Sequence, residues 1–123
     1  PKGHVEANES EEETAFRETL EETSVNVQIN NIFRYEISYQ MDNGNTKTVI
    51  YFLANFKNQT PKRNNDFEDF EYLLFPFDLA LQELTFENTK QMLRKANVFL
   101  KKVLHFCISV VYIYRSKNFQ GFL

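Results

Sequence analysis

The feature that most restricts the fold of this chain is a four-residue turn, Asp42-Asn43-Gly44-Asn45, between two β-prone segments. An Asn-Gly pair accepts the positive φ angles of tight hairpin turns. β-branched and aromatic residues fill the flanking segments 32–41 and 46–55. The pattern therefore predicts a long antiparallel hairpin, with a separate short strand over 25–29 before it.

A helix is predicted ahead of these strands. Ser10 followed by Glu13 is a capping box, in which each residue can satisfy a backbone amide of the other. The acidic residues of the first turn also suit the helix dipole. We expect this helix to run to about residue 23, with its apolar side facing inward through Ala15, Phe16, Thr19 and Leu20.

The second half predicts a strand over 71–77 ended by Pro76, a helical turn over 78–83 and a helix over 87–104. The run 103–114 is apolar apart from two residues, which is too short for a bilayer span of about 20 residues. It is interpreted as a buried strand or helix end. We predict one domain over 1–102, followed by an apolar extension of undefined role over 103–123.

The uneven charge of the chain limits its partners. Residues 1–24 contain eight carboxylates against only Lys2 and Arg17, within a net charge of −3. A dense acidic block repels phosphate unless cations sit in it, so a nucleic-acid polymer is not expected as a partner. The single cysteine, Cys107, excludes an internal disulfide and favours a reducing compartment: the cytoplasm, with the nucleus or mitochondrion as alternatives. No membrane span is expected.

Three carboxylates share one face of the first predicted helix. At about 100° per residue, Glu22 lies about 40° from Glu18, and Glu21 about 60° away on the other side. Like charges at this spacing destabilise a helix, whereas a divalent cation such as Mg²⁺ prefers such oxygen ligands. The ordinary alternative is a solvated acidic face, and it is favoured where only this spacing is known.

The surrounding residues carry a longer pattern. Gly3, five residues, Glu9, seven residues, and then Arg17-Glu18-x-x-Glu21-Glu22 resemble the Nudix box, and every charged position of that box matches. Thr19 stands where an aliphatic residue is usual. Ser24 replaces a glycine at a position after the helix that favours positive φ.

The resemblance implies a Nudix hydrolase with an α+β or α/β fold, an α/β/α sandwich around a mixed sheet. The family hydrolyses nucleoside diphosphates linked to another group, by water attack on phosphorus. It implies that Mg²⁺ or Mn²⁺ is bound by Glu18, Glu21 and Glu22 with a carbonyl near Gly3. Arg17 belongs to the implied catalytic set and, with Glu9, supports the box.

Flanking segments narrow the resemblance to the animal asymmetrical diadenosine tetraphosphate hydrolases, over roughly residues 1–102. They are Pro1-Lys2-Gly3-His4-Val5-Glu6, the segments 33–39 and 47–54, and the spacing across 86–100. The implied roles fall on further residues. Adenine would be stacked by Tyr39 and Phe86. Phosphate would be bound by Lys2, Lys47, Tyr51 and His4. Glu68 would bind metal or act as the base.

Each of these roles has an ordinary alternative. An aromatic residue on a strand is often part of the core, Lys47 beside a turn is often only solvated, and His4 is often a structural loop residue. The register of Glu68 depends on Tyr72, because the histidines that flank this glutamate in the animal enzymes are absent here.

The leading functional hypothesis is Mg²⁺-dependent hydrolysis of diadenosine tetraphosphate to ATP and AMP. Alternatives are another Nudix substrate (a diphosphoinositol polyphosphate, a capped RNA or a nucleoside triphosphate) or an inactive nucleotide-binding fragment. The chain begins at Pro1, two residues before the box. We therefore interpret it as N-terminally truncated, lacking strands of the family's sheet and exposing a sheet edge, and expect a monomer at full length.

Overall fold

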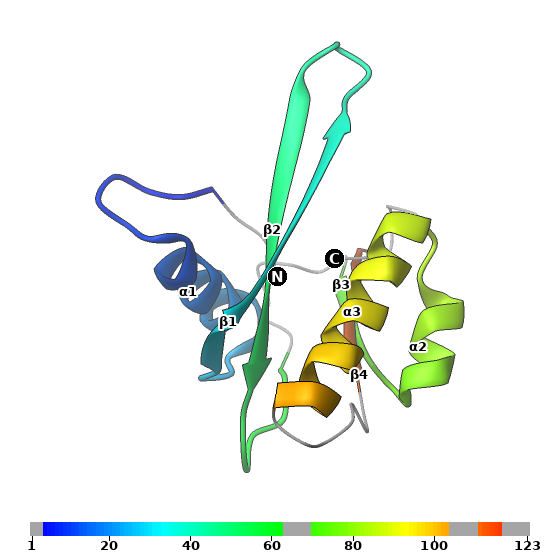
Figure 1. Ribbon diagram of the computed structural model, residues 1–123. Coiled ribbons are helices and arrows are strands. Elements are labelled where there is room, and N and C mark those ends of the chain that lie inside the picture. The colour runs from blue at the N-terminus through cyan, green and yellow to red at the C-terminus, as the bar shows by residue number, and fades with distance from the viewer. Residues whose placement is uncertain (1–3, 63–69, 104–110, 117–123) are drawn as a thin grey trace.

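A computed structural model describes residues 4–62, 70–103 and 111–116 (Figure 1). The elements, in chain order, are α1 (Glu11–Thr23), β1 (Gln28–Gln40), β2 (Thr46–Asn55), β3 (Phe70–Phe75), α2 (Phe77–Glu83), α3 (Glu87–Val103) and β4 (Val111–Ser116). The three predicted helical segments and the predicted strands 46–55 and 71–77 are confirmed to within two residues at each end. Residues 104–110 of the predicted apolar run 103–114 lie outside the described residues, and residues 111–114 belong to β4.

The predicted hairpin is formed by β1 and β2. The two strands pair antiparallel from Gln40↔Thr46 at the turn to Gln28↔Asn55 at the base. The turn closes through the Met41 amide, which donates to the Asn45 carbonyl at 2.7 Å, and Gly44 takes the positive φ of 82° that its sequence predicts. The expectation of a separate strand over 25–29 is wrong. β1 runs without a break from Gln28 to Gln40 and contains a bulge between Asn30 and Arg34.

Helices cover both faces of this hairpin, as the layered fold requires. α1 meets one face, where Arg34 of β1 donates to both carboxylate oxygens of Glu11 at 2.8 and 2.9 Å. α3 meets the other face, where Phe99 packs against Phe33 with ring centroids 5.5 Å apart. Figure 1 shows α1 and α3 on opposite sides of the hairpin. Neighbouring residues of a strand point to opposite faces, so the bulged strand presents different side chains to the two helices.

The buried side of α1 differs from the expectation. Phe16 is 37% exposed, whereas Thr14, Glu22 and Thr23 are buried. Burial of the threonines is tolerated because their hydroxyls are hydrogen-bonded. Thr14 Oγ1 donates to Glu9 at 2.8 Å, and Thr23 Oγ1 donates to the Thr19 carbonyl at 2.6 Å. The expectation is therefore wrong for Phe16, whereas Ala15, Thr19 and Leu20 are half-buried.

A second packing unit joins α2, α3 and the pair β3–β4. Its buried centre consists of Ala80, Leu84 and Leu93. β3 and β4 pair antiparallel from Phe70↔Ser116 to Phe75↔Val111. Both sheets in the described ranges are two-stranded and antiparallel, so the parallel pairing of a mixed sheet is not among these strands.

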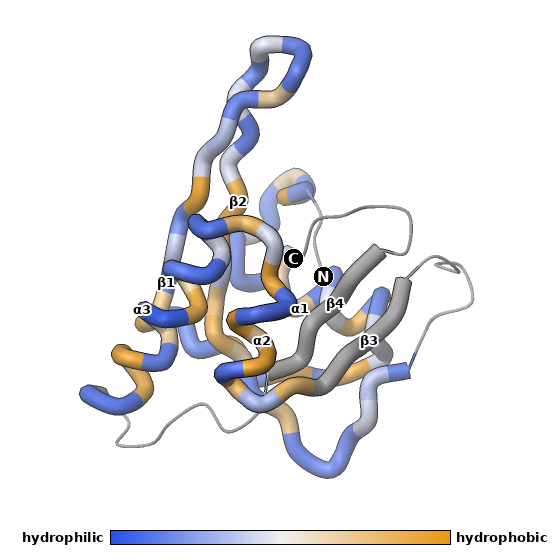
Figure 2. The backbone as a smooth tube through the Cα atoms, turned by 90° about the vertical axis from the view of Figure 1, so that its right-hand side faces the viewer, coloured by the Kyte–Doolittle hydropathy of each residue, from blue (hydrophilic) through white to orange (hydrophobic). Residues whose placement is uncertain are grey.

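The turn end of the hairpin projects beyond the helices. Figure 2 shows that this end is mostly hydrophilic, whereas hydrophobic segments lie nearer its base and in the helices. Among the helices that the structure describes, none is long and apolar enough to cross a membrane.

Candidate active site

The start of α1 is fixed by the predicted capping box. The Glu13 amide donates to Ser10 Oγ at 3.1 Å, and the Ser10 amide donates back to Glu13 Oε2 at 2.7 Å. Both interactions satisfy amides that the first helical turn would otherwise leave without acceptors. Within the helix that begins there, the period of 3.6 residues brings Arg17 and Glu21, four residues apart, onto one side.

Arg17 is the centre of the candidate site. Its Nε and Nη2 donate to the two carboxylate oxygens of Glu9 at 2.8 and 3.1 Å. Its Nη1 donates to Glu18 at 2.6 Å and to Glu21 at 3.2 Å, and its Nη2 also donates to the His4 carbonyl at 3.2 Å. We call this set the Arg17 network. It ties the loop before α1 to two later turns of the helix.

The network holds Glu9 in its charged form. The hydrogen bonds from Arg17 lower the pKa of Glu9 from 4.5 to about 2, although partial burial opposes the shift. The Glu6 amide at 3.1 Å and Thr14 at 2.8 Å also donate to this carboxylate. The same ion pairs, first with Glu9 and then with Glu18, raise the pKa of Arg17 further above its usual value. Both partners are therefore permanently charged near neutral pH.

The three implied metal ligands fit a hard divalent cation by their chemistry. Carboxylate oxygens are the groups Mg²⁺ prefers, and the side chains of Glu18 and Glu21 are 16% and 54% exposed beside a buried Glu22. In the structure, however, Arg17 binds both Glu18 and Glu21. Within residues 4–62, 70–103 and 111–116, no three acidic, histidine or cysteine side chains are close enough to hold a metal ion.

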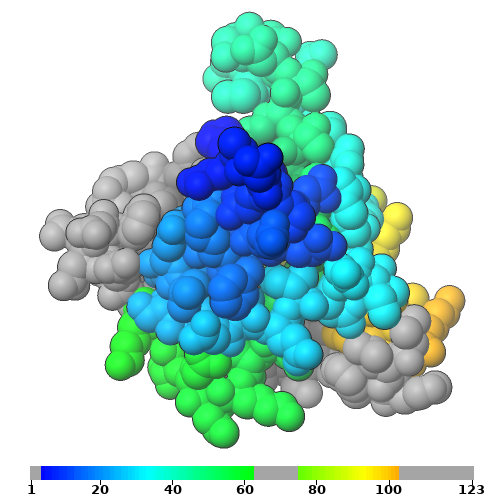
Figure 3. Space-filling view, turned by 90° about the vertical axis from the view of Figure 1, so that its left-hand side faces the viewer, coloured from blue at the N-terminus to red at the C-terminus, as the bar shows by residue number. Residues whose placement is uncertain are grey.

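Figure 3 looks onto the side of the molecule formed by the loop from residue 4 and α1, with the turn of the hairpin above them. Within the Arg17 network the side chains of Arg17, Glu9 and Glu18 are 24%, 15% and 16% exposed.

A second group of predicted residues comes together on the hairpin. Tyr39 pairs with Lys47 across the strands, and Tyr35 pairs with Tyr51. Alternation along each strand puts these four side chains on the same side, which we call the tyrosine face. Burial, together with the nearby hydroxyl of Tyr39, raises the pKa of Tyr51, which supports this shared side. Tyr39 is 45% exposed, so its ring is accessible.

The tyrosine face is the one that α3 covers. The Lys95 ammonium lies 5.2 Å from the centroid of the Tyr35 ring. Phe86, which immediately precedes α3, is 50% exposed, so its ring is accessible as well.

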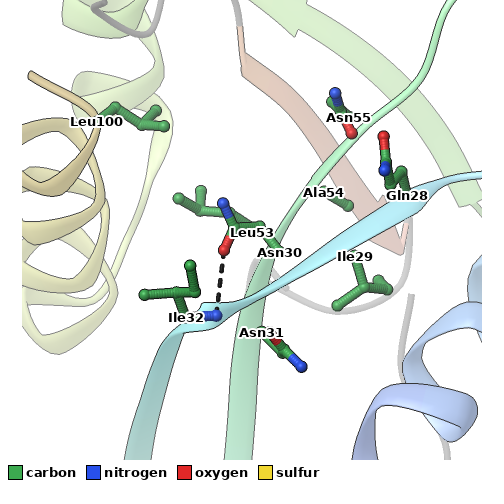
Figure 4. A pocket seen from close by; sticks show the side chains of 9 residues that line it. All are labelled: Gln28, Ile29, Asn30, Asn31, Ile32, Leu53, Ala54, Asn55 and Leu100. Atoms are coloured by element: carbon green, nitrogen blue, oxygen red, sulfur yellow. Dashed lines mark hydrogen bonds between the residues drawn. The ribbon is translucent and has the colours of Figure 1, made fainter. Parts of the chain in front are cut away.

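The two groups of predicted residues are not gathered into one pocket of the described chain. The Arg17 network belongs to the α1 side, whereas Tyr39, Lys47 and Tyr51 belong to the α3 side. An open pocket of about 380 Å³ lies elsewhere, at the base of the hairpin (Figure 4). None of the predicted site residues lines it; its lining includes Ile29, Ile32, Leu53 and Leu100.

The remaining predicted residues divide into two cases. Lys2, Gly3 and Glu68 lie outside the described residues. His4 is exposed, and its contact with the site is through its backbone carbonyl, which accepts a hydrogen bond from Arg17. The sequence did not predict the contact between Lys95 and Tyr35, because no local pattern marks residues so far apart as neighbours.

The chain belongs to the NUDIX domain family, which matches residues 1–96. It is similar to the rat protein named bis(5'-nucleosyl)-tetraphosphatase [asymmetrical], at 37% identity over 103 residues, or 81% of this chain and 69% of the rat protein. The pig and mouse proteins of the same name are 38% and 36% identical over the same shares of each chain. No solved structure matches significantly. The predicted resemblance is thereby confirmed, and the chain is a Nudix hydrolase.

Proposed function

We propose that this chain hydrolyses diadenosine tetraphosphate to ATP and AMP in a Mg²⁺-dependent reaction. The observation that carries the proposal is the Arg17 network, which joins Glu9 in the loop before α1 to Glu18 and Glu21 on the helix. The choice of substrate is supported by the names of the rat, pig and mouse relatives and by the accessible aromatic rings on the α3 side.

The proposed metal ligands are Glu18, Glu21 and Glu22, with a backbone carbonyl near Gly3. Bound Mg²⁺ or Mn²⁺ would supply positive charge that offsets the charge developing on the leaving phosphate. Arg17 would hold Glu18 and Glu21 before an ion binds, and it would anchor the preceding loop through Glu9 throughout. Binding of an ion would require these two carboxylates to turn from the guanidinium.

The proposed substrate contacts lie on the tyrosine face and at the start of α3. Tyr39 and Phe86 would stack on one adenine from either side, and a base–aromatic stack contributes about 1–3 kcal/mol. Lys47, opposite Tyr39, would bind the phosphates adjacent to that adenine. Tyr51 would donate a hydrogen bond to a phosphate further along the ligand. Lys2 and His4 would add phosphate contacts from the loop before α1.

The reaction consumes one water molecule. Its oxygen bonds to phosphorus, the bridging P–O bond breaks, and the released proton is taken up by a general base, for which Glu68 is the proposed residue. Cleavage beside one adenosine monophosphate unit leaves AMP and ATP. We also propose that the protein is a cytoplasmic monomer, a compartment supported by the single Cys107.

Incubation with diadenosine tetraphosphate and Mg²⁺, followed by chromatography, tests the proposal. Equal amounts of ATP and AMP are expected, and the reaction should stop when EDTA is added. ADP as the only product would overturn the asymmetrical cleavage. Faster turnover of a diphosphoinositol polyphosphate, capped RNA or nucleoside triphosphate under the same conditions would overturn the assignment of diadenosine tetraphosphate as the substrate.

A second candidate function is an inactive nucleotide-binding module. It is favoured by one observation: in the described residues Glu18 and Glu21 are bound by Arg17 and no metal-binding group is assembled. The same incubation distinguishes the two functions when it is paired with calorimetric titration of diadenosine tetraphosphate. Binding without any turnover would support the module, and turnover would exclude it.

A further inference from the structure

The end of α1 is held by a segment that is distant in the sequence. Gln59, in the loop after β2 and 33 residues beyond Asn26, brackets the backbone of that residue with its side-chain amide. The Asn26 amide donates to Gln59 Oε1 at 2.8 Å, and Gln59 Nε2 donates to the Asn26 carbonyl at 2.9 Å. In the same loop, the Lys62 amide donates to the Thr23 carbonyl at 2.8 Å. We call these three hydrogen bonds the α1 clasp. Figure 3 shows the residues that follow β2, in green, below α1.

The α1 clasp supplies contacts that the helix cannot make for itself. The last four carbonyls of an α-helix have no donor within the helix. Thr23 is the last residue of α1, and the Lys62 amide satisfies its carbonyl from outside. Val25, between the two points of attachment, is only 1% exposed. Residues 23–26 are therefore fixed at both ends and packed in the middle.

Two of the three proposed metal ligands belong to the turn that the α1 clasp holds. Glu22 immediately precedes Thr23 and is 5% exposed, and Glu21 is one residue earlier. Helix ends fray, so the last turn opens more readily than the middle of a helix. Opening of this turn would move both carboxylates away from Glu18, which lies about one turn earlier in the helix.

We propose that Gln59 is a positioning residue: it keeps the last turn of α1 closed and so holds Glu21 and Glu22 in place for a divalent cation. The inference rests on the proposed function, because it takes these glutamates as metal ligands. Gln59 acts through the Asn26 backbone and does not contact the ion. When the binding conformation is populated only part of the time, the measured affinity falls by that fraction. Loss of the α1 clasp should therefore weaken ion binding although every ligand is still present.

The variant Gln59→Leu tests the inference, because it removes both hydrogen-bonding groups of the side chain and nearly keeps its volume. Gln91→Leu, the same change at an exposed position of α3, is the matched control. Mn²⁺ binding to the whole chain is measured from the electron paramagnetic resonance signal of the free ion. Circular dichroism melts of the same samples give the stability of each variant.

We expect Gln59→Leu to weaken Mn²⁺ binding about fivefold at a temperature at which it remains folded. Gln91→Leu should bind Mn²⁺ as wild type does. A lower melting temperature of Gln59→Leu with unchanged Mn²⁺ affinity would show that Gln59 only supports the fold. That result would overturn the inference while the hydrolase function stands.

A second measurement needs no variant. Coupling between two sites is reciprocal, so an ion that the α1 clasp favours must also favour the α1 clasp. Addition of Mg²⁺ to the wild-type chain should therefore slow hydrogen exchange of the Asn26 and Lys62 amides. The Met41 amide, which closes the hairpin turn, should exchange as before.

The hydrogen-exchange result also separates the inference from the proposed function. Ion binding that leaves the Asn26 and Lys62 amides unchanged would overturn the inference alone. If the wild-type chain binds neither Mn²⁺ nor Mg²⁺ and does not turn over diadenosine tetraphosphate, the proposed function fails together with the inference.

Discussion

The Arg17 network and the tyrosine face are organised in different ways. Every partner of Arg17 lies within 13 residues of it, and the contacts are charged hydrogen bonds that begin from one capped helix. The tyrosine face instead depends on strand register and on α3, whose Phe99 and Lys95 meet Phe33 and Tyr35. The comparison separates a locally determined charge arrangement, proposed for the chemical step, from a surface assembled over long range, proposed for recognition.

The first prediction concerns the chemical step alone. Glu22→Gln should lower kcat for diadenosine tetraphosphate by about 10²-fold or more, because it removes one charge at nearly constant shape. Steady-state kinetics with Mg²⁺ measures the effect, and circular dichroism should report an unchanged fold. Glu83→Gln, at an exposed glutamate of α2, is the control. Near-normal turnover in Glu22→Gln would remove Glu22 from the proposed ligand set.

A change on the tyrosine face should affect binding instead. Tyr39→Ala is expected to raise KM about tenfold with little change in kcat, since loss of one base stack costs about 1–3 kcal/mol. Tyr39→Phe keeps the ring and serves as the control. The division between chemistry and recognition would break down if Tyr39→Ala lowered kcat and left KM unchanged.

The stability of the α1 side should depend on Arg17 and on pH. Arg17→Gln is expected to lower the melting temperature by several degrees, and by more than Arg34→Gln, because Arg34 forms a more exposed pair with Glu11.

The pH dependence follows from the low pKa of Glu9. Its folded pKa of about 2 lies below the ordinary value of 4.5, so the stability from this carboxylate is fully present above about pH 4.5 and is lost as the pH falls toward 2. In thermal melts, the difference between the melting temperatures of wild type and Arg17→Gln should therefore shrink as the pH falls from 7 to 2.5. A difference that stays constant with pH would contradict this account.

The smallest expected effect is at the end of α1. Ser24 has φ 58° and ψ 22°, and its amide donates to the Leu20 carbonyl at 2.9 Å. A left-handed conformation strains a residue with a Cβ, so Ser24→Gly should stabilise the chain by up to about 1 kcal/mol. Urea unfolding measures this, with Ser38→Gly on β1 as a control expected to destabilise. A loss of stability in Ser24→Gly would show that the serine is favoured for another reason.

The sequence predicted the parts of the molecule that depend on neighbouring residues. The Ser10–Glu13 capping box, the turn at Gly44 and the positive φ at Ser24 all follow from steric and hydrogen-bonding preferences within a few residues. The charged spacing from Glu9 to Glu21 likewise anticipated the contacts of Arg17, although not that Arg17 would bind Glu18 and Glu21 at the same time.

Features that depend on tertiary packing were not predictable in this way. The inward side of α1 was assigned from apolar residues, but Thr14 and Thr23 are buried there because their hydroxyls find local acceptors. The fusion of two expected strands into β1, and the position of Lys95 over Tyr35, depend on how distant segments pair and pack.

The bulge in β1 has a consequence for how this chain tolerates change in length. Asn30 pairs with Leu53 and Arg34 with Phe52, so three residues of β1 lie opposite no partner, an odd number that reverses the alternation of side chains. Deletion of a single residue between them would restore an even count. If the base of the strand kept its pairing, Tyr35 and Tyr39 would then exchange sides with Arg34 and Glu36. Among changes of length at this point, only insertions and deletions that preserve parity leave the tyrosine face where it is.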